Sequence, residues 1–417
     1  MTHPTPHHTT PALVGMGVRL PGPDGDVRGP HQMWQALLAG RTAIAPYPSD
    51  RWERMLPLLH PQDQKADPWP AALIAWPGFT PAQRWGLRGS DTEHLSPTQI
   101  LILQVVAEAL ADAGIDPTTL AGPGTGIYVA LSSPDDGLHV FAAGARPTLP
   151  ELSAGGAGMV ATAVSRWLNS RGPLGTYDAS CASAMYALNT ARRDLTEGVV
   201  EAAIVIGVNV LTHPVPTRSF ASGGVLALDG QVLPLDAHAH GYARGEAVEV
   251  AILRPYAQAL EHRDRVYALL THTAVGADGR SPTVGAPSAP ALAELMERTH
   301  TGSGVDTDQV PLVLAHGPGT MAGARAEARA LKSAYTRPDH DPVLVTSVKG
   351  LFGHSEAAAG LTNLLAGALM WHHGGQVPPT TGHTSPPKWL IEHGVRVAAP
   401  TDRLPTTGEH HLGVVAQ

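Results

Sequence analysis

The sequence predicts an α/β protein built from two similar halves, each with a sheet that helices cover on both faces. Apolar segments of strand length alternate with segments of helical periodicity, which is typical of parallel sheets. The order of these segments repeats after Pro255, which indicates a duplicated unit. At 43.5 kDa the chain is long enough for an extensive core.

The first half has clear strand and helix signals. Runs of apolar and β-branched residues predict strands at 11–20, 124–131, 199–210 and 246–253. Helical periodicity predicts helices at 31–40, 96–114 and 151–169. The helix at 96–114 has the best-defined ends, because Pro97 suits the first helical position and Gly114 follows the last apolar residue.

The second half repeats this alternation. Strands are expected at 266–275, 311–315, 343–348 and 411–416. Helices are expected at 289–300, 322–335 and 355–371.

These segments predict the division of the chain. We expect a disordered tail at 1–10, the first half at 11–258 and the second half at 259–417. The first half contains a stretch, about 41–91, in which proline, tryptophan and polar residues replace the regular pattern. This stretch is expected to form a loop-rich insertion.

Composition and charge disfavour two classes of partner. The formal charge is −8, the isoelectric point is near 6.2, and lysine and arginine form no cluster, which argues against nucleic-acid binding. The sequence has neither a membrane-spanning apolar segment nor the pattern of a signal peptide at its start. We therefore expect a cytoplasmic protein without a membrane partner.

Cys181 is the only cysteine of the chain, so it cannot form an intrachain disulfide. A short apolar run ends at Tyr177 and helix-forming residues follow, which predicts that Cys181 lies between a strand and a helix. The N-terminus of a helix stabilises a thiolate, which makes Cys181 a candidate nucleophile. The alternative is that Cys181 is a small buried apolar residue.

Two of the 22 histidines occupy the same kind of position as Cys181. His316 and His354 each follow a predicted strand, close to a glycine-containing turn, and each precedes a predicted helix. Ligands of α/β sheets bind at this end of the strands, so the three residues are candidates for one pocket. The alternative is that both histidines are surface residues without a catalytic role. No further ligand spacing for a metal is present, and no metal site is expected.

Three stretches together resemble the β-ketoacyl synthases of the thiolase superfamily, with a pattern similar to the ketosynthases of polyketide synthases. They are Asp178-Ala-Ser-Cys181-Ala-Ser183, His316-Gly-Pro-Gly-Thr320 and Ser347-Val-Lys349-Gly-Leu-Phe-Gly353-His354-Ser-Glu356-Ala-Ala-Ala-Gly360. The stretch Gly241-Tyr-Ala-Arg244-Gly-Glu246 is similar as well. The resemblance implies the thiolase fold, with two mixed five-stranded sheets in a layered αβαβα arrangement.

The resemblance also implies roles for individual residues. Cys181 would accept an acyl group, with its pKa lowered at the helix N-terminus. His316 and His354 would donate hydrogen bonds to the thioester oxygen of a malonyl-type extender. Lys349 and Glu356 would fix the charge and tautomer of the histidines, the alternative being a surface ion pair. Thr320 would help to hold the phosphopantetheine of an acyl carrier protein.

The resemblance further implies an acyl carrier protein as partner, a homodimer, and no cofactor other than the carrier's phosphopantetheine. The sequence departs from the family at Pro318, where a threonine is usual, and at Ala182, where a serine is usual. It also stops at Gln417, where the family continues into a glycine-rich gating loop and an edge strand. We expect either a truncated sequence or an enzyme without ordinary gated elongation.

Three functions remain open at this level. The first is a free-standing ketosynthase that forms a carbon–carbon bond by decarboxylative Claisen condensation. The second is a ketosynthase-like cyclase, performing aldol closure and lactonisation of the γ-lactam-β-lactone type, or an acyl transfer to oxygen or nitrogen. The third is a non-catalytic partner of the chain-length-factor type, which retention of Cys181, His316 and His354 disfavours.

Overall fold

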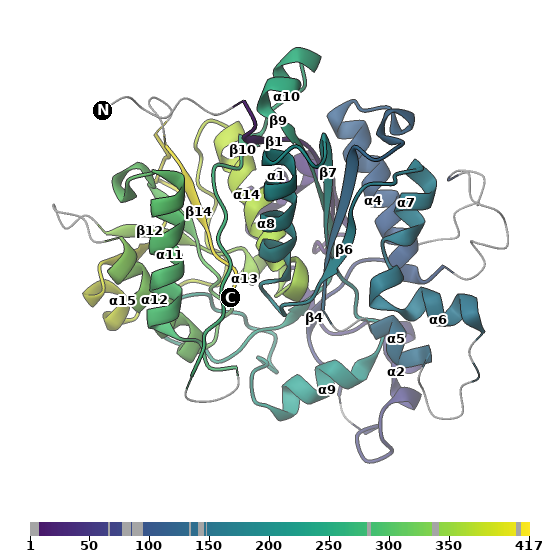
Figure 1. The fold of residues 1–417 in the computed structure, drawn as a ribbon. Helices are drawn as coiled ribbons and strands as arrows, with labels where there is room; N and C mark the ends of the chain where they lie inside the picture. The colour runs from purple at the N-terminus through teal and green to yellow at the C-terminus, as the bar shows by residue number, and fades with distance from the viewer. Residues whose placement is uncertain are drawn as a thin grey trace.

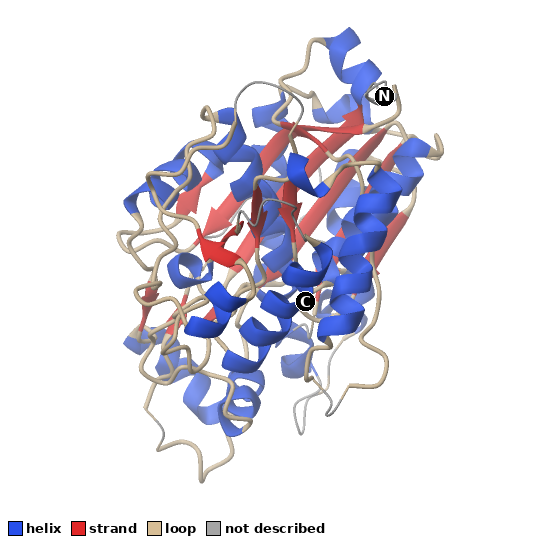
Figure 2. Cartoon of the chain, turned by 90° about the vertical axis from the view of Figure 1, so that its left-hand side faces the viewer, coloured by secondary structure: helices blue, strands red, loops and turns tan. Residues whose placement is uncertain are grey.

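The computed structural model describes residues 8–65, 67–76, 85, 95–132, 135–140, 146, 148–281, 285–335, 342–405 and 410–417. Two sheets are separated by a layer of helices and flanked by helices on their outer faces (Figure 1). Figure 2 shows the strands of the sheets from the side, surrounded by helices. This five-layer arrangement confirms the predicted αβαβα architecture.

The first sheet is mixed. Its order is β10-β1-β9-β7-β5-β6, with β2 paired to β1. Strand β5 is parallel to β6 and β7, whereas β9 is antiparallel to both β7 and β1. The strands are β1 (Pro11–Leu20), β2 (Val27–Arg28), β5 (Thr125–Leu131), β6 (Leu174–Tyr177), β7 (Ala202–Asn209), β9 (Ala247–Pro255) and β10 (Ala268–Leu269).

The second sheet is parallel, and within the described ranges it has the order β13-β12-β11-β14. Its strands are β11 (Leu312–Leu314), β12 (Val343–Thr346), β13 (Val395–Val397) and β14 (Leu412–Val414). A third, small sheet consists of β3 (Ile44–Ala45), β4 (Ala71–Ala72) and β8 (Arg244–Gly245). The sheets therefore differ in strand number and direction from the two mixed five-stranded sheets expected.

The strand expected at 266–275 is mostly wrong. Only Ala268 and Leu269 form a ladder, and they pair antiparallel with β1 at the edge of the first sheet. The backbone N–H and C=O groups of a strand need a neighbouring strand as partner. In the described part of the chain the second sheet ends at β14, so it offers residues 270–275 no such pairing. Residues beyond Leu269 therefore run as irregular backbone.

The middle layer contains α1 (Gly29–Ala39), α8 (Ser183–Thr196) and α14 (Ala359–His372). Helices α4 (Pro97–Ala113), α7 (Thr162–Leu168) and α10 (Tyr256–His262) lie on the first sheet's side of the molecule, and α11 (Ala289–Ser303), α12 (Met321–Ala334) and α15 (Lys388–Glu392) lie on the second sheet's side. The other α-helices of the described residues are α2 (Ser49–Met55), α5 (Asp135–Val140), α6 (Leu149–Gly155), α9 (Pro214–Ser222) and α13 (Lys349–Phe352).

Helix α4 has the boundaries that the sequence predicts. The hydroxyl of Ser96 accepts from the N–H of Gln99, whose side chain accepts from the N–H of Ser96, so a capping box starts the helix. Gly114 ends it with φ 67°, in the left-handed region.

The single helix expected at 151–169 is wrong. The chain forms α6, a 3₁₀ turn at Ala157–Met159 and α7 instead. Gly156 is extended, with ψ 127°, and interrupts the helical path. Glycine costs about 1 kcal/mol in a helix interior, so this small-residue stretch has little propensity to stay continuous.

Helices α8 and α14 approach each other closely because small residues line their contact. A Cβ added to Gly360 on α14 would lie 2.5 Å from the side chain of Met185 on α8. A Cβ added to Gly207 on β7 would lie 3.1 Å from Ala358. Glycine at these positions allows the N-terminal ends of both helices to meet between the sheets.

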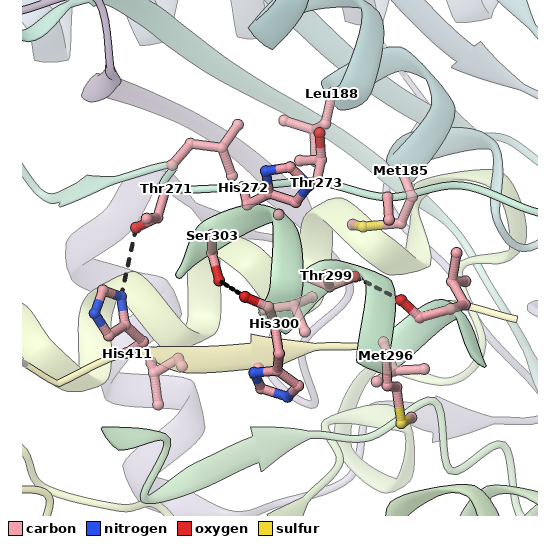
Figure 3. Close-up of a pocket in the computed structure, with 18 of the residues that line it drawn as sticks. Met185, Leu188, Thr271, His272, Thr273, Met296, Thr299, His300, Ser303 and His411 are labelled. Carbon is pink, nitrogen blue, oxygen red and sulfur yellow. Dashed lines mark hydrogen bonds between the residues drawn. The ribbon is translucent and has the colours of Figure 1, made fainter. Parts of the chain in front are cut away.

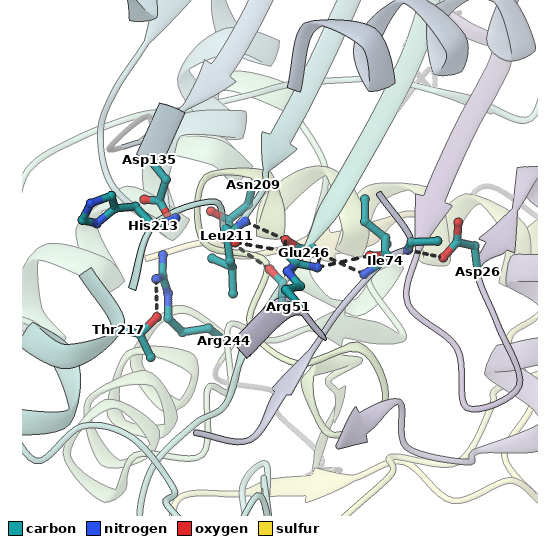
Figure 4. A network of polar contacts seen from close by, with 12 residues as sticks. Asp26, Arg51, Ile74, Asp135, Asn209, Leu211, His213, Thr217, Arg244 and Glu246 are labelled. Carbon is teal, nitrogen blue, oxygen red and sulfur yellow. Dashed lines mark hydrogen bonds and ion pairs between the residues drawn. The ribbon is translucent and has the colours of Figure 1, made fainter. Parts of the chain in front are cut away.

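The described part of the predicted insertion is anchored to the first half by a buried ion pair (Figure 4). Arg51 of α2 contacts Glu246 through both terminal nitrogens, and both side chains are buried. The carboxylate also accepts from the N–H groups of Ile74 and Leu211, at 2.9 and 2.7 Å. Residues 66, 77–84 and 86–91 of the insertion lie outside the described residues.

None of the helices within these described ranges combines the length and apolar character needed to cross a bilayer.

We predict that Arg51→Met lowers the free energy of unfolding by about 3–5 kcal/mol, because it leaves the Glu246 carboxylate buried without its counter-charge. Denaturant titration followed by circular dichroism measures the loss. Arg54→Met is the matched control, since the Arg54–Asp50 pair is exposed and its removal should cost less than about 1 kcal/mol. Equal, small effects of both substitutions would contradict the assigned role of Arg51.

Candidate active site

Cys181 lies in a tight turn between β6 and α8. Ser180 has φ 55°, in the left-handed region, and two neighbouring side chains hold it there. The carboxylate of Asp178 accepts from the N–H of Ser180 at 3.1 Å, and the hydroxyl of Ser183 bridges the N–H of Ala179 and the carbonyl of Ser180. Strain of this kind persists only where the surroundings enforce it, and it is common at functional sites.

In the part of the chain that the structure describes, no hydrogen bond of this turn is donated by the N–H of Cys181. The hydrogen bonds that hold the turn use the N–H groups of Ala179, Ser180, Ala182 and Ser183. The N–H of Cys181 lies beside its own sulfur, where it favours the thiolate and lowers the thiol pKa. An oxygen on an acyl group bound to this sulfur could accept from the same N–H.

The direction expected for the Cys181 pKa is wrong. Burial raises the pKa of the thiol, and the negative charge of Glu356 raises it further. The Ser180 hydroxyl and the Lys349 ammonium act in the opposite direction. Helix α8 begins only at Ser183, so the thiol lies outside its first turn, and loss of hydration dominates.

The structure brings Cys181, His316 and His354 together. The sulfur and one ring nitrogen of each histidine all lie within 4.8 Å of one another. The two imidazole rings are 5.1 Å apart and nearly perpendicular, and both histidines are buried. His316 follows β11, as the sequence predicts, whereas α13 lies between β12 and His354, where the sequence predicted only a turn.

Backbone donors fix the tautomer of both histidines. The N–H of Gln417 donates to Nδ1 of His316 at 3.4 Å, and the N–H of Glu356 donates to Nδ1 of His354 at 3.1 Å. A neutral imidazole whose Nδ1 accepts a hydrogen bond carries its proton on Nε2. Both rings can therefore donate from Nε2, and this tautomer opposes metal binding through the same nitrogen.

The histidines are held neutral. Burial lowers the pKa of both rings well below the usual range, and the Lys349 ammonium lowers it further. His354 adds to this effect on His316, and Arg244 adds to it on His354. Neutral rings with a proton on Nε2 act as hydrogen-bond donors and do not provide a cation.

Lys349 is buried and contacts the backbone of His316. Its ammonium donates to the His316 carbonyl, and burial lowers the pKa of this lysine to about 8. Glu327 of α12 lies on the other side of the same turn and accepts from the N–H groups of His316 and Gly317, at 2.5 and 2.9 Å. The two charges together fix the backbone that carries the His316 ring.

Glu356 pairs with Arg244 and not with Lys349. Its carboxylate accepts from Nε and Nη2 of Arg244, at 2.5 and 2.8 Å, and Arg244 also donates to Thr217 at 2.7 Å. Both members of this pair are buried, and Lys349 is buried as well, so the alternative of a surface ion pair is wrong. The backbone N–H of Glu356, rather than its carboxylate, fixes the tautomer of His354.

Thr320 lies at the N-cap of α12, four residues after His316, and is half-buried. Its role in holding phosphopantetheine stays a prediction.

Sequence reasoning missed two of these residues. Glu327 lies on the same helical face as Ala324, Ala328 and Leu331, so a carboxylate at an otherwise apolar position was the available signal. Arg244 belongs to a stretch that resembles the family but gave no indication of its partner.

A cavity of about 1,830 Å³ borders the edge strand β14 (Figure 3). Ala179 and Ala182, which flank the Cys181 turn, line one side of it, whereas the three reactive side chains do not line it. Figure 3 shows methionine, threonine and histidine side chains around it, among them Met185, Thr271, His272, Met296 and His411.

Two family models match most of the chain. The model of the N-terminal domain of β-ketoacyl synthases matches residues 11–259, and that of the C-terminal domain matches residues 267–384.

Curated relatives are large synthases. A phenolphthiocerol/phthiocerol polyketide synthase of Mycobacterium tuberculosis is 34% identical over 380 residues, covering 88% of this chain and 20% of the relative. The 6-methylsalicylic acid synthase of Aspergillus niger is 34% identical over 387 residues, covering 88% of this chain and 21% of the relative. The chain thus spans about a fifth of the length of these relatives, and its expected free-standing state stays a prediction.

Solved structures give the same result. The ketosynthase from module 6 of the bacillaene synthase of Bacillus subtilis 168 matches with a TM-score of 0.83 and 26% identity, covering 96% of this chain and 67% of that one. An oxazolomycin ketosynthase domain of Streptomyces albus JA3453 matches with a TM-score of 0.83 and 26% identity, covering 97% and 71%. These matches confirm the fold class that the sequence predicts.

We predict that the rate of alkylation of Cys181 by iodoacetamide keeps rising beyond pH 9, because burial raises the pKa of the thiol. Lys349 loses its proton near pH 8, which removes a cation that favours the thiolate and acts in the same direction. Intact-protein mass spectrometry follows the reaction at a single site, since no other cysteine exists. N-acetylcysteine is the reference thiol, and a plateau below pH 8 would contradict the prediction.

Proposed function

The chain belongs to the β-ketoacyl synthase family, and we propose that it forms a carbon–carbon bond from an acyl group held as a thioester on Cys181. The observation that carries the proposal is the convergence, within 4.8 Å, of the only thiol of the chain and two imidazoles. The backbone contacts make both imidazoles Nε2 donors. A non-catalytic partner would not need this arrangement.

In the first step, the sulfur of Cys181 attacks the thioester carbonyl of an acyl group delivered on a carrier protein. The bond between the acyl carbon and the carrier sulfur breaks, and the proton of the Cys181 thiol ends on the departing carrier thiol. The N–H of Cys181 donates to the oxygen that becomes negative in the tetrahedral intermediate.

In the second step, a malonyl-type extender loses carbon dioxide. Its thioester oxygen accepts from Nε2–H of His316 and of His354, and the carbon–carboxylate bond breaks to leave an enolate on that oxygen. Two neutral donors fixed before the reaction stabilise this charge without reorganisation. The nearby positive charges of Lys349 and Arg244 favour the enolate as well.

In the third step, the enolate carbon attacks the acyl carbon on Cys181. The new carbon–carbon bond forms, the carbon–sulfur bond breaks, and the lengthened chain stays on the carrier of the extender. The sulfur of Cys181 leaves as a thiolate and regains a proton from solvent.

An acyl carrier protein is the proposed partner. Both substrates are thioesters of its long phosphopantetheine arm, which must enter the buried site. Thr320 would contact this arm from the turn that carries His316. Acyl groups of the polyketide type are the proposed substrates, by analogy with the relatives. The chemistry needs no cofactor of its own.

We also propose a homodimer through the edge of the first sheet. Among the described residues, β6 is the last strand on its side of that sheet, and Leu174 on it is 39% exposed. Met159, in the 3₁₀ turn beside β6, is exposed too. An apolar strand edge of this kind is suited to pairing with a second copy.

We predict that wild-type protein mixed with an acyl-carrier thioester gains the mass of the acyl group and that Cys181→Ala does not. Addition of malonyl-carrier should then discharge the enzyme and yield a carrier-bound chain longer by two carbons. Replacement of His316 or His354 by alanine should leave acylation intact but slow decarboxylation by about 10²–10³-fold, because an oxyanion donor is lost. Intact-protein mass spectrometry of enzyme and carrier measures each step.

Release of a free product without an extender would favour cyclisation or acyl transfer over elongation. Absence of acylation with a varied panel of acyl carriers would contradict the nucleophile assignment.

For the dimer, we predict that Leu174→Lys converts the protein to a 43.5-kDa monomer in size-exclusion chromatography with light scattering, because a charge is placed at the paired edge. Leu228→Lys is the control, since Leu228 is 60% exposed and belongs to the turn closed by the bond from Gly230 to Ala227, not to β6. A dimer that tolerates Leu174→Lys would place the interface elsewhere.

A further inference from the structure

Strand β9 carries a carboxyl group that has no counter-charge among the described residues. Glu249 is completely buried, and the hydroxyl of Thr362 on α14 donates to its Oε2 at 2.7 Å. Oε1 has no hydrogen-bond partner in the same described part of the chain. Burial raises the pKa of this carboxyl to about 8.

The sheet itself does not require this carboxyl. On the same face of β9, Ala247, Ala251 and Leu253 belong to the apolar core. A buried carboxyl with an unpaired oxygen destabilises the folded state, whereas an apolar side chain of similar size would not. Natural sequences depart from local rules of this kind chiefly at functional sites.

Glu249 is connected to the turn of His354 through two hydroxyls. The Thr362 oxygen lies 2.9 Å from the hydroxyl of Ser355, the residue after His354. A hydroxyl has a single proton, so while Thr362 donates to Glu249 it accepts from Ser355. The Thr362 hydroxyl also lies 3.3 Å from the Ala358 carbonyl, but its bond to Glu249, at 2.7 Å, is the shorter one. With the proton in that shorter bond, the hydrogen bonds run from Ser355 through Thr362 to Glu249.

The turn that Ser355 belongs to needs support. Glu356 has φ 44°, an unfavourable value for a residue with a side chain. Backbone bonds from His354 to Ala243 and from Gly245 to His354, both 2.8 Å, hold one side of the turn. The Ser355 hydroxyl holds the side that faces α14.

Movement of this turn would change the donor geometry of His354. The N–H of Glu356 that fixes the tautomer of His354 belongs to the same turn. When the turn shifts, this N–H no longer donates to Nδ1, and the proton of the ring is no longer held on Nε2. A misplacement of about 1 Å in a reacting group can slow a reaction by about 10²-fold.

We propose that Glu249 is a positioning residue: through Thr362 and Ser355, its carboxyl holds the turn that aims the Nε2–H of His354 at the extender. The inference rests on the proposed function for the role of His354, and on the described contacts for the role of Glu249. The Glu249 carboxyl itself touches no substrate.

The test compares variants that break the hydrogen-bond chain with variants that keep it. Thr362→Val and Glu249→Leu remove a donor and an acceptor, whereas Thr362→Ser and Glu249→Gln retain them. Val250→Ala is the control for stability, because Val250 is buried on the same strand but packs in the core on the other face. All variants are compared well below their melting temperatures.

We expect Thr362→Val and Glu249→Leu to slow decarboxylation of malonyl-carrier by about tenfold or more, because His354 is misplaced. Alkylation of Cys181 by iodoacetamide should change less than about twofold, since the turn of Cys181 is held by Asp178 and Ser183. Thr362→Ser, Glu249→Gln and Val250→Ala should retain decarboxylation. Equal losses in both reactions, or a similar loss in Val250→Ala, would show a structural role and overturn the proposal.

Amide hydrogen exchange of the segment 353–358 measures how firmly the turn is held. It does not depend on decarboxylation, so it tests the role of Glu249 separately from the proposed function. Faster exchange in Thr362→Val than in Val250→Ala supports the positioning role even when the wild-type protein does not decarboxylate malonyl-carrier. Unchanged exchange in Thr362→Val overturns it. Absence of wild-type decarboxylation with altered exchange would contradict the proposed function alone.

Discussion

The contact between the N-terminal ends of α8 and α14 is the constraint on which the site depends. Each helix packs between two sheets, and the glycine at 360 allows them to approach. Helix α8 directly follows the Cys181 turn and α14 follows the His354 turn, so this contact sets the separation of the two reactive groups. Because packed cores do not deform gradually, the separation is held closely.

The charged side chains of the site hold the backbone and one another in place, and they keep the two histidines neutral. Glu327 and Lys349 fix the backbone of His316, and Arg244 fixes Glu356. Both of these carboxylates are held by other donors, so neither is placed as the counter-charge of a protonated imidazole. The outcome is a pair of neutral donors in a buried environment, where a hydrogen bond to a developing negative charge is strongest.

Local sequence predicted the α/β class and most of the strands and helices, and it named three candidate residues whose role the family resemblance then implied. His316 comes just after β11, Cys181 comes after β6 and a short turn, and His354 comes after β12 and α13, and strand ends of this kind are visible in the local sequence. The ends of α4 were predictable because Ser96 and Gly114 cap it through neighbouring residues. The pKa direction of the thiol was not predictable, since its burial comes from distant segments. The strand at 266–275 failed for a similar reason, because ladder formation depends on a neighbouring strand.

The segment Arg244–Glu246 connects the insertion with the histidines. Arg244 pairs with Glu356, which lies two residues after His354. Glu246, two residues after Arg244, pairs with Arg51 of the insertion (Figure 4). Docking of the described part of the insertion and assembly of the His354 turn share one stretch of backbone, so we expect the two to be thermodynamically linked. Linkage is reciprocal: a molecule that binds better when the insertion is docked stabilises the assembled turn, and a substrate that binds the assembled turn tightens the insertion by the same free energy.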